Sequence, residues 1–450
     1  MPAISALGVG SGLDLNGLLD QLRSSERQRL VPISEQRTEE QAKISAYGRL
    51  QSGLEKLQGA VDTLNDASTY TNLTANVQGD GMTASVGEEA SAGRYEITVN
   101  QTARAGSLAS QGVSDPSAAL VGAGGDTLTL TFDGRSDSTV TLAEGDSLED
   151  IRDAINADDA AGVDASIIND GANSRLVLSS RESGADAGIE SMSFANASLT
   201  GDTNTKQAGR DASLDINGIQ GITSSTNRVE DAIQGVTLEL DPSSAGETLS
   251  LGVEADTESL KESVQAFVSA YNEMKSTVGR MTDATGDVET AGELVGDRTV
   301  RTIESRLSRD LTNPISGGDM EIMSAVGISL DDSGRLELDE DKLDEVIADN
   351  PEGLQGFFAG TTEEGGFAGR LGGSLDNMLD SDGMVQRAID SSEGQVERIE
   401  DRFDRTEQSI ERTVERYRSQ FSQLDGLIAQ MNSTSAYLSQ QLAGLNTQSS

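Results

Sequence analysis

A seven-residue apolar repeat runs through the C-terminal part of the chain, from Val385 to Leu445. The apolar heptad positions follow one another without a break: Ile389, Val396, Phe403, Ile410, Tyr417, Leu424, Met431, Leu438 and Leu445. A second apolar line runs beside the first: Ile399, Val414, Phe421, Ile428 and Leu442. A repeat of this length predicts one long helix that supercoils against a partner. At ~1.5 Å per residue the helix would extend roughly 90 Å.

Two shorter helices are predicted near the N-terminus. Asp14 is placed to cap the first helix, and Pro32 to end or kink it. One face of this helix is apolar: Leu15, Leu18, Leu19 and Leu22. The second helix has apolar positions that alternate steps of three and four: Tyr47, Leu50, Leu54, Leu57, Val61 and Leu64. Extended backwards, that register meets polar residues: Lys43, Glu40 and Gln36.

The second helix is the predicted antiparallel partner for part of the C-terminal helix. We expect residues 389–417 to pack within the chain, beside the N-terminal helices. The part beyond Leu424 outruns this partner, so it needs the first helix, another subunit or a different protein. If the two chain ends pair, the middle of the chain is an insertion between them.

The middle of the chain changes from the helical period to the alternation typical of strands. Alternating apolar residues predict strands over 73–99, and again over 214–253, which we expect to return to the same sheet. Between them lies a compact unit over 127–183, with strands and a helix at 147–156. The Gly-, Ala- and Ser-rich stretches 103–126 and 184–211 are interpreted as linkers. The unit over 127–183 is therefore an insertion within an insertion.

Helical patterns return after residue 256. Helices are expected over 257–281, 294–311, 342–348 and 352–358, and a β-hairpin over 328–339.

These patterns predict a multidomain α+β protein with helical legs from both chain ends and nested β-rich head domains. The expected parts are an N-terminal leg helix (1–40), a helical leg domain with a hairpin (41–69 plus 257–415), a β-rich head domain (70–104 plus 205–256), an inserted outer α+β domain (105–204) and a C-terminal leg helix (416–450).

Composition narrows the possible functions. Acidic residues outnumber basic ones 76 to 33, and a net charge of −43 disfavours binding to nucleic acid or an anionic membrane surface. We interpret the acidity as a solubility feature of the kind found in salty habitats. The chain has neither Cys nor His, which excludes disulfides, thiol nucleophiles and Ser-His or Cys-His catalysis. No apolar run approaches the ~20 residues that span a bilayer, and the N-terminus is not typical of a cleaved signal peptide.

Three motifs suggest chemistry, and each has a simpler interpretation. The GVGSG of residues 8–12 lacks the preceding strand and the Walker lysine of a phosphate loop. Residues 329–340 place Ser329 and Ser333 where a calcium loop has acidic ligands. Acidic pairs such as Asp158–Asp159, Glu363–Glu364 and Asp380–Asp382 are expected by chance in so acidic a chain. No catalytic residue, cofactor or metal site is predicted, so an enzyme is not expected.

Several stretches resemble the flagellar filament cap family, also called hook-associated protein 2. GVGSGLDLNGLLDQL resembles the opening of the family, and RYRSQFSQLDGLIAQMNSTSAYLSQQLAGL resembles its closing segment. Further matches lie at residues 232–240, 267–278, 327–343 and 351–360. The stretch 147–180 is similar to a module shared between cap proteins and flagellins. The matches follow the expected order over nearly the whole chain.

The resemblance implies a non-enzymatic cap at the distal end of the bacterial flagellar filament. Such caps leave the cell through the flagellar export channel without a cleaved signal peptide, and therefore act outside the cell. The implied partners are further copies of the chain, a pentamer being expected, together with flagellin, the hook-associated junction proteins and a cytoplasmic export chaperone. No membrane insertion is expected.

The predicted contact residues are apolar positions of the two legs: Leu15, Leu18, Leu19, Leu22, Leu424, Leu427, Ile428, Met431, Leu438 and Leu442. Two alternatives stay open. The chain is another axial or junction protein, although neither end resembles flagellin. Or it is an adhesin whose head binds host glycan, although residues 103–210 contain few aromatic side chains for sugar stacking.

Overall fold

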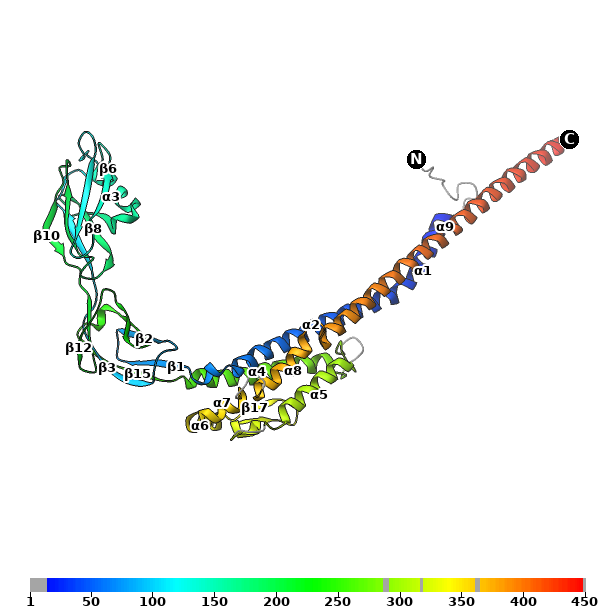
Figure 1. The fold of residues 1–450 in the computed structure, drawn as a ribbon. Coiled ribbons are helices and arrows are strands. Elements are labelled where there is room, and N and C mark those ends of the chain that lie inside the picture. The colour runs from blue at the N-terminus through cyan, green and yellow to red at the C-terminus, as the bar shows by residue number, and fades with distance from the viewer. Residues whose placement is uncertain (1–13, 286–290, 316–318, 361–364, 448–450) are drawn as a thin grey trace. The chain divides into compact units, whose positions relative to one another are not determined.

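The computed structural model describes residues 14–285, 291–315, 319–360 and 365–447 of the 450-residue chain (Figure 1). The chain forms two compact units, a helical unit of Met1–Thr69 with Glu258–Ser450 and a β-rich unit of Tyr70–Thr257. The helical unit is built from both ends of the chain, and the β-rich unit from the segment between them. The predicted α+β class is therefore confirmed.

The helical unit is organised along two long helices, α2 (Val31–Asn65) and α9 (Met384–Thr447). The remaining elements are α1 (Leu15–Arg27), α4 (Thr257–Thr282), α5 (Arg298–Thr312), α6 (Glu340–Asp349), α7 (Pro351–Phe358) and α8 (Phe367–Leu379). Helix α1 ends at Arg27, and Pro32 lies in the first turn of α2, where the missing N–H has no helical acceptor to lose. The two predicted N-terminal helices are confirmed.

The core of the helical unit forms around the C-terminal half of α2. Its apolar positions from Leu50 to Leu64 are fully buried, and α8 packs beside this half of α2 (Figure 1). Three phenylalanines from three helices meet next to them, since the ring of Phe367 lies 5.7 Å from that of Phe267 and 5.6 Å from that of Phe357. Aromatic pairs at these distances add to the stability from burial alone.

The predicted hairpin is confirmed as β16 (Ile328–Leu330) paired with β17 (Leu336–Leu338). Helix α4 holds it: the Asn272 side chain donates to the Leu336 carbonyl at 2.8 Å and accepts from its N–H at 2.9 Å. The Tyr271 hydroxyl donates to the Gly334 carbonyl at 3.0 Å, and burial raises the pKa of Tyr271 to about 12. The hairpin is therefore tied to the helical core by side chains, not only by apolar contact.

The β-rich unit begins and ends in one sheet. Its strands are ordered β1-β15-β3-β11-β12, and their bounds are β1 Leu73–Gln78, β15 Thr248–Ala255, β3 Gly93–Gln101, β11 Ala212–Ile216 and β12 Ile219–Ser224. The first strand pairs antiparallel with the last, Leu73 opposite Ala255. A three-stranded sheet accompanies it, with β13 (Arg228–Ile233), β14 (Val236–Leu240) and β2 (Met82–Val86) in that order. The predicted return of the late strands to the early sheet is confirmed.

A second apolar core lies within the β-rich unit, over the segment predicted as an insertion within an insertion. Its sheets are ordered β10-β4-β8-β7 and β6-β5-β9. The bounds are β4 Ala105–Ser110, β5 Asp126–Phe132, β6 Ser138–Leu142, β7 Val163–Asn169, β8 Ser174–Ser183, β9 Ile189–Phe194 and β10 Gly201–Gln207. Helix α3 (Leu148–Ala157) starts with a capping box between Ser147 and Asp150, and buries Leu148, Ile151 and Ile155 in this core.

The linker interpretation of residues 103–126 and 184–211 is wrong. Strand β4 lies in the first stretch, and β9 and β10 lie in the second. Small residues are needed there because the backbones come close: a Cβ on Gly106 would lie 2.8 Å from the Gly188 Cα. The composition that suggested linkers therefore belongs to tightly packed strands.

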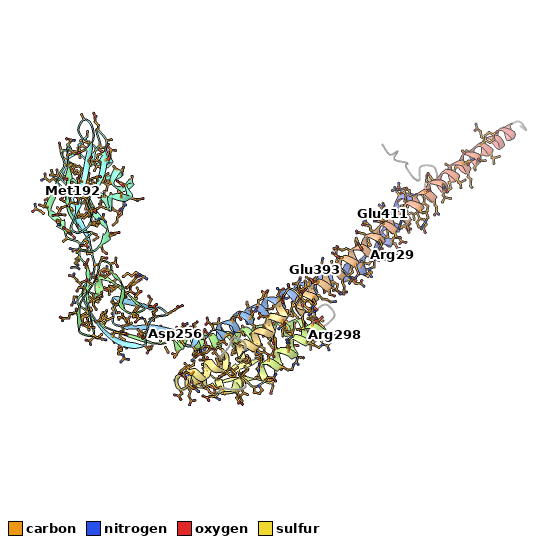
Figure 2. All side chains as sticks on the ribbon, viewed as in Figure 1. Arg29, Met192, Asp256, Arg298, Glu393 and Glu411 are labelled. Carbon is orange, nitrogen blue, oxygen red and sulfur yellow. The ribbon has the colours of Figure 1, made fainter. Side chains whose placement is uncertain are left out.

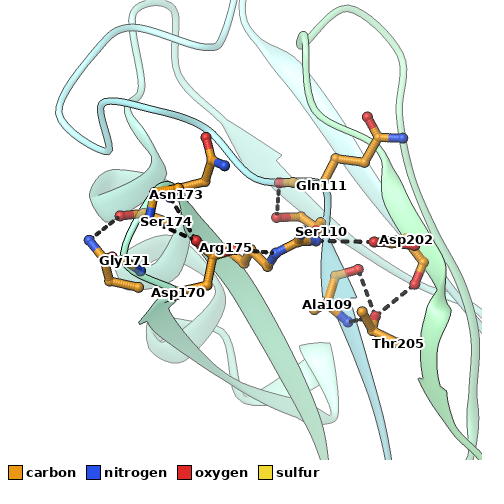
Figure 3. Close-up of polar contacts among 12 residues, drawn as sticks. Ala109, Ser110, Gln111, Asp170, Gly171, Asn173, Ser174, Arg175, Asp202 and Thr205 are labelled. Atoms are coloured by element: carbon orange, nitrogen blue, oxygen red, sulfur yellow. Dashed lines mark hydrogen bonds and ion pairs between the residues drawn. The ribbon is translucent and has the colours of Figure 1, made fainter.

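Arg175 links three strands of this outer sheet (Figure 3). Its guanidinium donates to the Ser110 carbonyl at 3.1 Å, to the Asp202 carboxylate at 3.0 Å and to the Asp170 carboxylate at 3.3 Å. Ser110 is at the end of β4, Asp202 is in β10 and Asp170 follows β7. One side chain thus ties the edge strand β10 to the centre of the sheet.

Candidate interaction surface

Helix α1 and the short turn after it pack against α9, and we call this region the terminal coil (residues 15–30 and 403–421). Arg23 pairs with Glu411 at 3.3 Å and Arg27 with Glu407 at 3.8 Å, so four residues forward in α1 match four residues back in α9. The two helices are therefore antiparallel, as Figure 1 shows. Side chains along this coil, including Arg29 and Glu411, are drawn in Figure 2.

The apolar contact inside the terminal coil is small. Leu19 and Leu30 are buried against Ile410 and Val414, and further apolar side chains of α9 pack partly buried around them: Phe403, Tyr417 and Phe421. The prediction that residues 389–417 pack within the chain is confirmed, with α2 and α1 as the partners.

Beyond Phe421, the apolar repeat of α9 faces solvent in the described chain. We call this stretch the C-terminal seam: Leu424, Leu427, Ile428, Met431 and Leu438. Leu427 is 60% exposed, Met431 71% and Leu438 55%, while Ile428 is half-buried. Exposed apolar side chains in a continuous row are typical of a surface that binds another protein.

The same stretch is almost without charge. From residue 419 to residue 450, the sequence has a single charged side chain, Asp425, although 24% of the whole chain is charged. Depletion of charge together with exposed apolar residues is the composition of an interface core rather than of a solvated helix face. This second observation, independent of exposure, marks the seam as the candidate interaction surface.

The structure separates the predicted contact residues into two groups. Leu15 and Leu19 are buried and Leu22 is half-buried, whereas Leu18 is 50% exposed. Leu424, Leu427, Met431 and Leu438 are exposed together on α9. The side chain of Leu442 lies outside the described residues.

Two residues of this region were missed by sequence reasoning. Tyr437, which is 62% exposed beside Leu438, falls outside both apolar lines of the repeat. Leu30 lies in a short 3-10 turn between α1 and α2, where no helical pattern predicts its burial against α9. An aromatic residue next to a heptad position, and an apolar residue just before Pro32, were the available signals.

The motifs set aside in the sequence serve local structure where they are described. Asp331 accepts hydrogen bonds from the Ser333 hydroxyl at 2.7 Å and the backbone N–H groups of Ser333 and Arg335, each at 2.8 Å. These bonds, the one from the Ser333 hydroxyl first, hold the pKa of Asp331 below its usual range. Asp159 pairs with Arg181 at 3.6 Å. The GVGSG motif and the Glu363–Glu364 pair lie outside the described residues.

Two further findings concern only the described part of the chain. None of its helices has the length and apolarity that crossing a membrane requires. It also contains no group of three or more acidic side chains placed to hold a metal ion.

The fold and this surface define a class of protein: a multidomain assembly protein whose two chain ends form a helical unit with an exposed apolar helix end, and whose middle forms β-rich modules. Three family models match in order along the chain. "Flagellar hook-associated protein 2 N-terminus" matches residues 11–106, "Flagellin hook IN motif" residues 127–182, and "Flagellar hook-associated protein 2 C-terminus" residues 209–433. The chain belongs to the flagellar hook-associated protein 2 family.

Individual relatives match over their full length. Flagellar hook-associated protein 2 of Escherichia coli K12 is 33% identical over 98% of this chain and 98% of its own. The protein of the same name from Salmonella typhimurium is 33% identical over 99% of this chain and 100% of its own. The crystal structure of the D1-D2-D3 domains of the flagellar cap protein FliD from Escherichia coli superposes with a TM-score of 0.61 at 28% identity, covering 77% of this chain and 99% of that one.

Proposed function

We propose that this chain is the structural cap at the distal end of the bacterial flagellar filament, where it promotes the insertion of exported flagellin and prevents its loss. The observation that carries the proposal is the C-terminal seam, which is apolar, exposed and nearly uncharged in a member of a family of flagellar cap proteins. Exposed apolar surface is unfavourable in water and is typical of a site that another protein covers. The role needs no catalytic group.

We assign each of the proposed partners to one part of the chain. The leg segments 1–40 and 416–450 contact other copies of the chain, in a ring that we propose to be a pentamer, together with the hook-associated junction proteins and the filament tip. Before export, the same C-terminal segment binds a cytoplasmic chaperone that covers the seam. The β-rich unit then lies toward arriving flagellin. We propose that the chain reaches this extracellular site through the flagellar export channel, without a cleaved signal peptide.

The decisive experiment replaces exposed seam residues, so that folding is not at stake. A triple variant, Leu427→Ser with Met431→Ser and Leu438→Ser, is introduced into the source organism in place of its own cap gene. A matched control replaces exposed polar residues of the same helix: Gln423→Ser, Gln430→Ser and Gln440→Ser. We expect the seam variant to abolish swimming and to release flagellin monomer into the medium, while the control swims normally.

The purified proteins provide the second measurement. The seam variant should keep the circular dichroism spectrum of the parent chain but lose the assembly that light scattering detects at high concentration. A seam variant that still swims and still assembles would disprove the role assigned to this surface.

A further inference from the structure

The buried face of α2 is interrupted by one acidic residue. Between Ile33 and Ala46, the only buried side chain of α2 is Glu40, whose residue is 8% exposed. The apolar contacts of the terminal coil lie on one side of this position, and the fully buried core positions that begin at Leu50 lie on the other. The two apolar regions along the helical pair are therefore separated by a polar layer at Glu40.

Glu40 is only half satisfied in this position. Its Oε1 accepts from the Lys43 ammonium at 2.7 Å, but Lys43 lies on the same helix, so this pair does not join α2 to α9. Its Oε2 is buried and has no hydrogen-bond partner among the described residues. A buried carboxylate oxygen without a partner destabilises the packed state relative to the open one, in which water would solvate it.

Packing is also incomplete around this residue. Two hollows, of about 580 Å³ and 370 Å³, are both lined by Glu40 of α2 and Gln395 of α9. The larger extends toward Asp297 and Arg387, and the smaller toward Arg402. Side chains that face a hollow make fewer contacts with other protein atoms, so packing between α2 and α9 is incomplete next to the buried charge.

We propose that the polar layer at Glu40 is a built-in weak joint, at which the terminal coil opens as one unit while residues 46–64 stay packed. Opening separates α1 from α9 and exposes Ile410 and Val414, which extends the apolar surface of α9 from the C-terminal seam back toward Phe403. Continuous helices set no such boundary by themselves, because α2 runs unbroken through the layer. The proposal concerns the isolated chain and does not depend on the capping role.

Hydrogen exchange of backbone amides, measured by mass spectrometry on the full chain, tests the joint. In the parent chain, amides of 15–30 and 403–421 should exchange together and faster than those of 46–64, because they share one local opening. The Glu40→Leu variant should slow exchange in both terminal-coil segments by roughly tenfold or more, since an apolar side chain fills the layer without a buried charge. Lys43 is left near the surface, where water solvates it.

A second glutamate of α2 provides the matched control. Glu35 is exposed on the same helix and lines neither hollow, so Glu35→Leu should change exchange in the terminal coil by less than about twofold. Two results would overturn the proposal. One is that the terminal-coil segments of the parent chain exchange as slowly as residues 46–64. The other is that a folded Glu40→Leu protein shows unchanged or faster exchange in those segments. If circular dichroism shows that Glu40→Leu is not folded, Glu40→Gln decides: slower exchange in the terminal coil supports the joint, and unchanged exchange refutes it.

Discussion

In the β-rich unit, a single buried carboxylate fixes the position of a loop. The sequence does not distinguish this carboxylate from those on the surface. Asp126, at the start of β5, is buried and accepts four backbone N–H bonds, from Thr127 at 2.7 Å, Ala195 at 3.0 Å, Asn196 at 3.0 Å and Ala197 at 2.7 Å. Burial by itself raises the pKa of Asp126, but the four bonds outweigh it and hold the pKa below its usual range. Among the many acidic residues of the chain, nothing in the sequence marks this one.

We expect Asp126→Asn to destabilise the β-rich unit by about 1–3 kcal/mol at pH 7, because an amide cannot accept all four bonds and leaves buried N–H groups unpaired. Since the pKa is lower in the folded state than in the unfolded one, the carboxylate contributes its full stability above the unfolded value of about 3.9. That contribution is lost as the pH falls from the pKa of the unfolded state through the lower pKa of the folded state. Urea unfolding should therefore show a gap between parent and variant at pH 7 that narrows below about pH 4. Asp137→Asn, at an exposed position after β5, should show no gap at either pH.

At the scale of elements, periodicity predicted most of the helices but missed α8 (Phe367–Leu379), and composition misled for some strands. The helices around Leu50–Leu64 and Leu260–Val278 were predicted because steps of three and four persist over many turns. Strand β4 was not predicted, because its residues (AGSLAS) are small and its central position depends on contacts with strands distant in sequence. The exposure of the C-terminal seam was predictable from the unequal lengths of the helices, whereas the unpaired oxygen of Glu40 depends on side-chain positions that no pattern encodes.

The close approach of glycine backbones predicts a sensitive position in β4. Gly106→Ala would place its Cβ 2.8 Å from the Gly188 Cα and 3.2 Å from the Gly209 N, and backbone atoms cannot move aside as a flexible side chain does. We expect a loss of about 1–3 kcal/mol in the unfolding free energy of the β-rich unit. Gly252→Ala in β15 is the control, because its Cβ would meet only the Asn76 carbonyl at an ordinary 3.8 Å. Equal effects of the two substitutions on urea unfolding would contradict this account of β4.

At the scale of the whole molecule, the chain separates into two units, each with its own apolar core. The β-rich unit contains two apolar clusters of its own, and its first and last strands pair with each other. A fragment of residues 70–257 therefore includes every partner of its own strands. We expect it to fold alone, with a circular dichroism spectrum dominated by β structure and one cooperative unfolding transition; a helical or unfolded spectrum would refute the nested arrangement.

The charge of this fragment predicts how its stability depends on salt. Acidic side chains predominate in it, and its basic residues are all arginine except Lys206, so like charges repel across its surface. Screening shortens the reach of this repulsion from about 30 Å at 0.01 M salt to about 3 Å at 1 M. The thermal unfolding midpoint should therefore rise as sodium chloride is added, and level off toward about 1 M. Chloride is preferred to sulfate in this titration because sulfate also strengthens apolar burial. A variant tests this by replacing four exposed acids that form no ion pair within the described part of the chain: Glu88→Gln, Glu89→Gln, Asp137→Asn and Glu190→Gln. Its midpoint should be higher than that of the parent fragment at low salt and should depend less on salt. If parent and variant fragments show the same dependence, surface repulsion is not what limits the stability of the β-rich unit.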